Sequence, residues 1–114
     1  MTEAGLATAI RGHRFRFCSE LELCDGLEKV FTSEGIAFER EYRLTSRDRL
    51  DFLVGSIAVE VKAKFSSPAV TMQIFRYLQH PGITGALLVT SRRKHDLPAL
   101  INGKPVFVEV VGGL

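Results

Sequence analysis

The sequence predicts an α/β domain in which a central mixed sheet is flanked by helices, and three observations indicate this class. Apolar residues at helical spacing alternate along the chain with short apolar runs that are typical of strands. Residues 83–90 (ITGALLVT) are apolar almost throughout, as in a strand buried on both faces. A helical pattern separates two strand-like segments, as in a unit with parallel strands. Together they give the order α-β-β-β-α-β followed by a terminal strand.

The length and composition support one folded domain over residues 1–114. The chain has 114 residues, 46% of them hydrophobic, and a formal net charge of +2, which by itself does not indicate a nucleic-acid partner. Residues 1–10 lack the basic start and apolar run of a signal sequence, and no apolar run approaches the ~20 residues that span a bilayer. We therefore expect a soluble, cytoplasmic protein with no membrane partner.

The N-terminal third is expected to hold one clear helix. Residues 1–12 are small and weakly patterned, which indicates a flexible arm or a short helix. Residues 13–17 alternate and predict a short strand or an extended lead-in. Ser19 is then a suitable N-cap for a helix that ends at Gly35. Its apolar stripe consists of Leu23, Leu27, Val30 and Phe31.

The rest of the chain reads as strands with one further helix. The expected strands are residues 36–44, 50–54, 57–64, 83–90 and 105–111. The second helix has its body at residues 69–79, is opened by 66–68 and is stopped by 80–82. Residues 97–102 are expected to form one helical turn.

The turn Gly55–Ser56 sets the expected register of the second and third strands. Two residues with glycine first are typical of a type II′ hairpin. That register places Asp51 opposite Glu60, with Cβ atoms roughly 4.5–5.5 Å apart. Side-chain alternation then puts Lys62 on the same face. The opposite, apolar face carries Leu50, Phe52, Val54, Ile57, Val59 and Val61.

Two carboxylates that face each other repel, and a divalent cation relieves this repulsion because hard cations take oxygen ligands. A cation beside a lysine suits phosphodiester hydrolysis, since both groups stabilise the negative charge of the transition state. The structural alternative is a solvated polar face on a half-exposed hairpin that carries Asp51, Glu60 and Lys62 without binding a metal.

Residues 51–64 (DFLVGSIAVEVKAK) resemble the signature of the PD-(D/E)XK nuclease superfamily, which includes restriction endonucleases, Holliday-junction resolvases and RecB-like nucleases. Asp51 matches the family aspartate, and Glu60-Val61-Lys62 matches the (D/E)XK element. Leu50 stands where the motif's name has proline. The resemblance implies a restriction-endonuclease-like core, hydrolysis dependent on Mg²⁺ or Mn²⁺, and products that carry 5′-phosphates.

Two further features are similar to this superfamily. Gln73 and Tyr77 match the QxxxY motif of the RecB-like branch and point from one helix face, where they would orient the site or touch substrate. The first helix carries glutamates, of which Glu20 shares the inward stripe and Glu22 is the second choice. The implied metal ligands are Asp51, Glu60, the backbone carbonyl of Val61, and Glu20.

Basic residues are clustered even though the net charge is small. Such clusters can bind phosphate backbones, although solvated surface charge is the favoured explanation for any single member. The candidates for nucleic-acid binding are Arg14, Arg16, Arg47, Arg76, Arg92, Arg93 and Lys94.

The sequence therefore predicts a metal-dependent DNA nuclease acting on duplex, branched or single-stranded DNA. The alternative is a non-catalytic nucleic-acid-binding or accessory subunit with the same fold. A second alternative, which the small size of the chain permits, is an accessory subunit whose larger protein partner supplies the substrate platform; self-association into a homodimer would serve the same purpose. Stabilisation by Mg²⁺ or Mn²⁺ separates the catalytic protein from the binding module.

Overall fold

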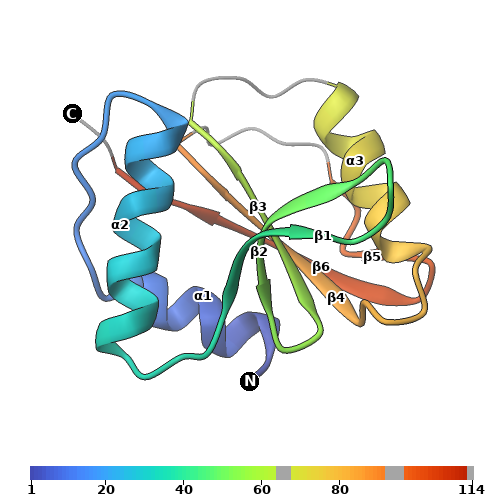
Figure 1. Cartoon of the computed structure of the whole chain (residues 1–114), viewed down its shortest axis with the longest axis horizontal. Helices are drawn as coiled ribbons and strands as arrows, with labels where there is room; N and C mark the ends of the chain where they lie inside the picture. Colours follow the sequence, from blue (N-terminus) through green and yellow to red (C-terminus); the bar gives the residue numbers. More distant parts are fainter. Residues whose placement is uncertain (64–67, 92–96, 113–114) are drawn as a thin grey trace.

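The computed structural model describes residues 1–63, 68–91 and 97–112, in which a six-stranded mixed sheet is covered by helices on both faces (Figure 1). The helices are α1 (Glu3–Arg11), α2 (Glu20–Ser33) and α3 (Pro68–Leu78). The strands are β1 (Glu39–Arg43), β2 (Arg49–Val54), β3 (Ile57–Lys62), β4 (Gly85–Thr90), β5 (Leu100–Ile101) and β6 (Lys104–Val110). Within the described ranges, none of the helices combines the length and the apolar character that a membrane span requires.

The strand order is β1-β2-β3-β4-β6-β5. Strands β1, β2 and β3 pair antiparallel, whereas β3, β4 and β6 are mutually parallel and β5 returns antiparallel to β6. The expected parallel pairing of the strands on either side of α3 is confirmed. Helices α1 and α2 lie on one face of the sheet and α3 on the other (Figure 1).

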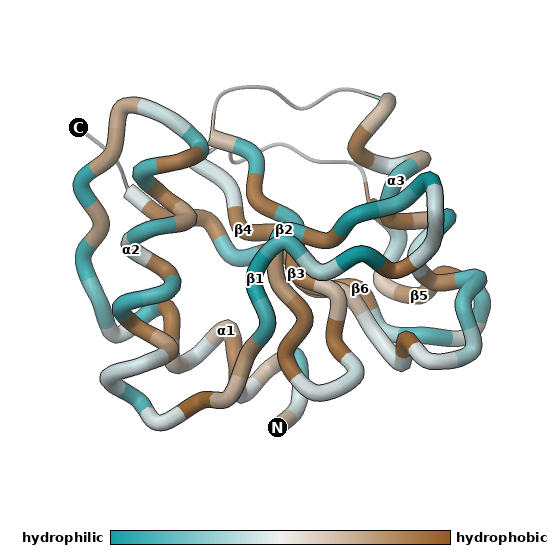
Figure 2. The backbone as a smooth tube through the Cα atoms, in the orientation of Figure 1, coloured by the Kyte–Doolittle hydropathy of each residue, from teal (hydrophilic) through white to brown (hydrophobic). Residues whose placement is uncertain are grey.

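The core consists of two apolar clusters, one on each face of the sheet. On the α2 side, the rings of Phe31 and Phe52 meet edge to face with centroids 5.2 Å apart. On the α3 side, Tyr77 and Leu88 belong to a second buried cluster. Every residue of β4 is buried, as its sequence predicts. Figure 2 shows β3 and β4 as hydrophobic tube segments and β1, at the sheet edge, as a hydrophilic one.

Of the two alternatives expected for residues 1–12, the short helix is confirmed and the flexible arm is not, because this segment forms α1. Thr2 caps it by accepting a hydrogen bond from the backbone N of Gly5 at 3.0 Å. Leu6, Ala7 and Ile10 are buried in the core on the α2 side. The small residues that made the pattern look weak allow the helix to pack closely on the sheet.

The helical turn expected at residues 97–102 is also wrong. Leu100 and Ile101 form β5, which pairs with Pro105 and Lys104 of β6. The cause is the dipeptide Asn102-Gly103, whose φ angles of 54° and 72° are those of a type I′ hairpin turn. The element order therefore begins with an additional helix and ends in two strands instead of one.

The remaining elements lie close to their expected ranges. Residues 13–17 run beside α2 without strand pairing, which is the extended lead-in (Figure 1). The turn at Gly55–Ser56 is confirmed, since Val54 pairs with Ile57 and Gly55 has a φ of 60°. Strand pairing in this register extends to Phe52 and Val59. It does not extend to the next expected pair, Asp51 with Glu60.

The regular alternation of side chains along β1 and β2 is interrupted where Glu41 lies opposite Asp51. The pairs on either side, Arg40 with Phe52 and Tyr42 with Leu50, keep one register, but Glu41 adopts a left-handed φ of 55°. Beyond this break Leu50 packs in the cluster on the α3 side, whereas Phe52 packs on the α2 side. The expectation that Leu50 shares the face of Phe52 is therefore wrong.

Candidate active site

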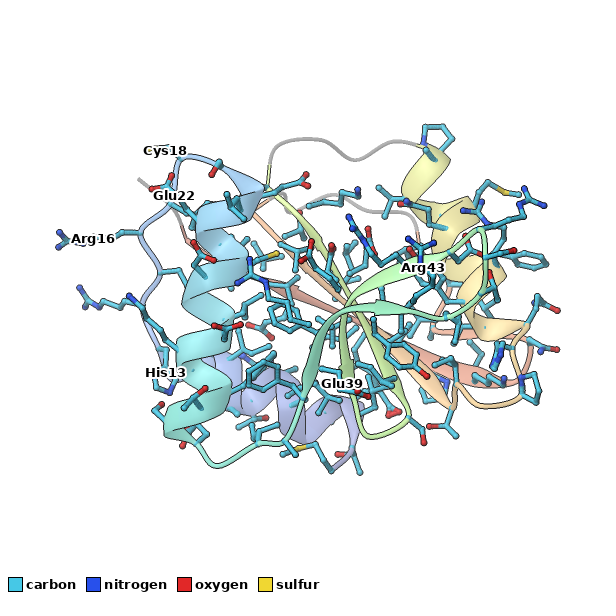
Figure 3. All side chains as sticks on the ribbon, viewed as in Figure 1. His13, Arg16, Cys18, Glu22, Glu39 and Arg43 are labelled. Carbon is cyan, nitrogen blue, oxygen red and sulfur yellow. The ribbon has the colours of Figure 1, made fainter. Side chains whose placement is uncertain are left out.

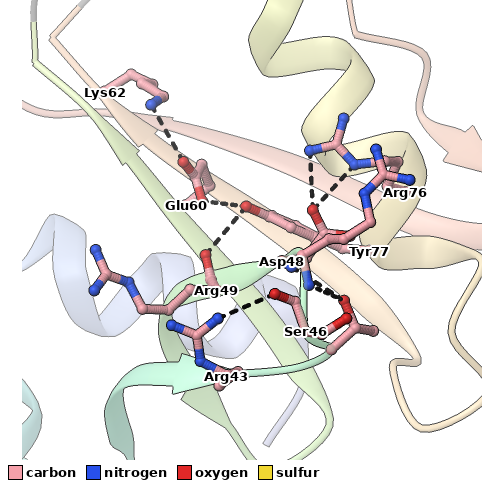
Figure 4. A network of polar contacts seen from close by, with 10 residues as sticks. Arg43, Ser46, Asp48, Arg49, Glu60, Lys62, Arg76 and Tyr77 are labelled. Atoms are coloured by element: carbon pink, nitrogen blue, oxygen red, sulfur yellow. Dashed lines mark hydrogen bonds and ion pairs between the residues drawn. The ribbon is translucent and has the colours of Figure 1, made fainter.

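Glu60 is the buried centre of a polar network that connects β3 to α3 (Figure 4). It is only 4% exposed. The Nζ atom of Lys62 lies 3.3 Å from its Oε2, and the hydroxyl of Tyr77 donates to its Oε1 at 3.1 Å. The Tyr77 hydroxyl also lies 3.4 Å from the carbonyl oxygen of Arg49 on β2. Three of the predicted site residues are thus in direct contact.

Asp51 reaches the same place from the neighbouring strand. Its Oδ2 accepts a hydrogen bond from the backbone N of Val61 at 2.7 Å. The pairing of β2 with β3 stops just before Asp51, so its carboxylate takes the place of a backbone acceptor. The expected proximity to Glu60 arises from this bond to the next residue of β3, and not from a continued ladder pair.

Burial and mutual repulsion make ionisation of the two carboxyl groups costly. The pKa of Glu60 is raised to about 7, chiefly by burial and next by the charge of Asp51, while Lys62 and Tyr77 oppose the rise. Burial also raises the pKa of Asp51, although the Val61 hydrogen bond and Lys62 act against it. The site therefore concentrates negative charge in a place that favours a cation.

The two donors of the network stay protonated. Burial disfavours the charged form of Lys62, but the carboxylates of Glu60, Glu20 and Asp51 outweigh it and raise the pKa of this lysine. Burial and the charge of Glu60 raise the pKa of Tyr77 as well. Lys62 is accordingly a cationic hydrogen-bond donor, which suits charge stabilisation better than removal of a proton.

The structure separates the two glutamates at the start of α2. The Oε1 atom of Glu20 lies 3.4 Å from the backbone N of Ala63, which directly follows β3. Glu22 instead turns back, where its Oε1 accepts from the backbone N of Cys18 at 2.8 Å. Glu20 is therefore the glutamate that lies beside the end of β3.

The donor chemistry at this site fits a divalent cation. The residues offer carboxylate oxygens on a partly buried surface, and burial raises the pKa of both Asp51 and Glu60, so a cation that binds them would favour their ionised form. In the part of the chain that the structure describes, no group of three or more His, Cys, Asp or Glu side chains is assembled to hold a metal ion. Binding through Asp51, Glu60 and Glu20 therefore requires their side chains to move together.

The other predicted site residues lie in different settings. Gln73 is half-buried one turn before Tyr77 and has no hydrogen-bond partner among the described residues. Arg76 donates from both Nε and Nη2 to Oδ1 of Asp48, at 3.0 and 2.9 Å, so it secures α3 to the turn before β2. Arg47 is exposed in that turn, whereas Arg92, Arg93 and Lys94 lie outside the described residues.

Arg14 and Arg16 are exposed in the segment that runs beside α2. Figure 3 shows the side chain of Arg16 directed away from the body of the molecule. Neither arginine has an ion-pair partner in the described ranges, unlike Arg11, which binds Glu109 at 2.7 Å, and Arg40, which binds Asp25 at 2.8 Å. These arginines therefore fall into two groups: those that form ion pairs within the fold, and exposed ones that do not.

Two neighbours of the site were not expected from the sequence. Cys24 is buried on α2, and burial, followed by the charge of Asp51, raises the pKa of its thiol to about 12. Its position four residues after Glu20 was the signal that it shares a helix face with the site. Glu41 carries the left-handed backbone opposite Asp51, and no sequence pattern marks a glutamate for that conformation.

Comparisons with protein-family models, with curated proteins and with solved structures find no match for this chain. Its function is therefore inferred from the arrangement of Asp51, Glu60, Lys62 and Tyr77.

Proposed function

We propose that this protein is a metal-dependent nuclease that hydrolyses phosphodiester bonds of DNA. The observation that supports the proposal is the convergence of Asp51, Glu60 and Lys62 at one end of β3. A buried acid paired with a lysine and a second acid is costly to keep for stability alone. A catalytic role would explain the presence of these buried charged groups.

In the proposed mechanism Asp51 and Glu60 would hold Mg²⁺ or Mn²⁺, together with the Val61 carbonyl and Glu20. Such a cation would supply a water of lowered pKa and positive charge that stabilises the transition state. Lys62 remains protonated, so it orients the attacking water through a hydrogen bond and neutralises charge that develops on a phosphate oxygen.

Tyr77 acts through Glu60 as a positioning residue. Its hydroxyl joins α3 to β3 and fixes one oxygen of the carboxylate, while Lys62 approaches the other oxygen. Gln73 lies one helical turn before Tyr77, and its unpaired amide is available to contact substrate.

We further propose that the α/β architecture is of the restriction-endonuclease-like kind. A β2-β3 hairpin that carries the acidic motif, followed by α3 and the parallel strand β4, supports this assignment. The additional helix α1 and the β5-β6 hairpin are elaborations around that core.

The test is cleavage of labelled linear, branched and single-stranded DNAs in Mg²⁺ or Mn²⁺. Wild-type protein is compared with Lys62→Ala and with the matched control Lys104→Ala, whose lysine lies on β6. We expect Lys62→Ala to lose cleavage by at least about 100-fold while its DNA affinity changes by less than about twofold, because its role lies in the transition state. Lys104→Ala should cleave like wild type.

Equal cleavage by Lys62→Ala and wild type would refute the site. Metal-independent DNA binding without cleavage of any substrate would instead support the non-catalytic binding module.

A further inference from the structure

A pocket of about 310 Å³ lies on α2, where the segment that precedes the helix runs alongside it. It is separate from the carboxylate site, and its volume is at the lower end of the range for ligand pockets, which suits a small group. Its lining includes His13, Arg14, Phe15, Arg16, Gly26 and Lys29.

The pocket is lined by positively charged side chains, and these are not engaged in ion pairs with other described residues. Arg14, Arg16 and Lys29 are exposed and have no ion-pair partner in the described part of the chain. This differs from Arg11, Arg40 and Arg76, each of which is held by a carboxylate. Three unpaired cations around one hollow favour an anionic ligand.

Two glutamates that flank the pocket residues in the sequence, Glu22 and Glu34, are already engaged in other contacts. Glu34 Oε1 lies 3.3 Å from Nε2 of His13, a residue that lines the pocket. Glu22 caps the start of α2 through the backbone N of Cys18. Figure 3 shows His13 and Arg16 spread along the outer side of α2, with Glu22 toward its start.

The apolar part of the pocket depends on a glycine. Phe15 packs against Gly26 so closely that a Cβ atom at position 26 would lie 3.0 Å from the Phe15 ring. Phe15 is thereby fixed against the helix, and the arginines on either side of it are among the residues that line the pocket, with the side chain of Arg16 extending outward (Figure 3). The basic groups are therefore displayed by an anchored segment.

We propose that this pocket binds a phosphate group through Arg14, Arg16 and Lys29. Guanidinium groups bind phosphate oxygens in a bidentate manner, and the lysine adds a point charge. The phosphate comes either from the backbone of the DNA or from a free phosphate ion. The backbone source rests on the nuclease function proposed above, and the free source does not.

The position of the pocket fits a contact remote from the bond that is cut. Lys29 follows Glu20 by nine residues on α2, which is about 13 Å along the axis at 1.5 Å per residue. This span corresponds to about four nucleotides of a strand at 3.4 Å each. The pocket would then set the direction in which a strand leaves the carboxylate site.

The first arm of the test uses inorganic phosphate in metal-free buffer, followed by backbone amide chemical shifts in NMR. We expect saturable shifts at residues 14–16 and at Lys29 in the wild type, and their loss in Arg14→Gln/Lys29→Gln. Because this arm needs neither metal nor cleavage, its outcome is independent of the nuclease proposal.

The second arm measures affinity for labelled DNA in EDTA across a salt series. We expect Arg14→Gln/Lys29→Gln to lose affinity about tenfold and to flatten the salt dependence by about one unit of slope, as for one phosphate contact. Lys104→Gln serves as the control for charge on a residue outside the pocket and should stay within about twofold of wild type.

Phosphate shifts together with reduced DNA affinity assign a backbone phosphate to the pocket. Phosphate shifts with unchanged DNA affinity assign a free phosphate ion. Absence of saturable phosphate shifts at these residues overturns the proposal, whatever the nuclease assay shows.

Discussion

The hydroxyl of Tyr77 on α3 donates a hydrogen bond to Oε1 of Glu60 on β3 at 3.1 Å, and both groups are buried. This bond joins the helix on one face of the sheet to the acidic residue at its centre. Because the hydroxyl favours the ionised carboxylate, it opposes the rise in the pKa of Glu60. The bond therefore links the stability of the fold to the protonation state of Glu60, on which the proposed hydrolysis depends.

Tyr77→Phe should lower the unfolding free energy by about 1 kcal/mol, since a buried hydrogen bond is lost without a change in packing. The loss should be larger at pH 8 than at pH 5, because only the ionised Glu60 depends on the hydroxyl. Denaturant unfolding at both pH values measures it. Tyr42→Phe is the matched control, and an equal, pH-independent effect of both variants would contradict this role.

The stability of the wild type should fall as the pH rises from about 5 to about 8. The pKa of Glu60 lies at about 7 in the folded protein, against an ordinary value of 4.5. Between these values the folded state holds more protons than the unfolded state, so unfolding becomes easier as pH increases. A shift of this size corresponds to at most about 3 kcal/mol.

Glu60→Gln should remove most of this pH dependence, whereas Glu39→Gln, at the exposed start of β1, should keep it. Thermal unfolding of the three proteins from pH 5 to pH 8 provides the comparison. A wild-type profile that rises over this range would contradict the buried, ionisable state of Glu60.

Mg²⁺ or Mn²⁺ should raise the melting temperature at pH 8, because a cation relieves the repulsion between Asp51 and Glu60. At an ion concentration 100 times its Kd the gain is about 2.7 kcal/mol. Asp51→Asn should abolish the gain while it retains an acceptor for the Val61 amide. Asp25→Asn, which alters an exposed carboxylate bound to Arg40, should keep the gain.

Absence of divalent binding to the wild type in a calorimetric titration at millimolar ion would exclude the metal site.

Much of the strand pattern was predictable because its causes are local. The apolar run of β4 and the glycine of the Gly55–Ser56 turn each specify their structure within a few residues. The same was true of the β5-β6 turn, where Asn102-Gly103 carried a hairpin signal that the helical reading of residues 97–102 missed. Helix α1 was left as one of two alternatives, beside a flexible arm, because its apolar stripe is short and rich in alanine.

The residues that lie together at the candidate site were predictable in part. The spacing of Asp51, Glu60 and Lys62 placed them near each other, and a helical offset placed Tyr77 with Gln73. The hydrogen bond from the Val61 amide to Asp51 and the side change of Leu50 were not predictable, because both accompany the break in strand pairing beside the left-handed Glu41. Likewise, the presence of Lys29 and Arg14 around one pocket depends on how residues 13–17 run alongside α2.

The left-handed Glu41 should be what lets β2 turn Asp51 toward Val61. A non-glycine residue at this φ costs about 1–2 kcal/mol, and a β-branched residue costs more. Glu41→Gly and Glu41→Asn accept the conformation, so we expect both to retain stability within about 1 kcal/mol and to retain cleavage. The ion pair lost with Arg49 is exposed at 3.6 Å and contributes little.

Glu41→Val should behave differently, because valine favours extended backbone. Either the chain keeps the left-handed turn at a cost of about 2 kcal/mol, or β1 straightens and carries Leu50 and Asp51 out of place. Both outcomes lower stability, and the second also removes cleavage. The matched control is Glu39→Val, two residues earlier in the same strand, where the regular pair with Leu53 accepts valine. If Glu41→Val unfolds and cleaves DNA as the wild type does, the break in β1 does not position Asp51.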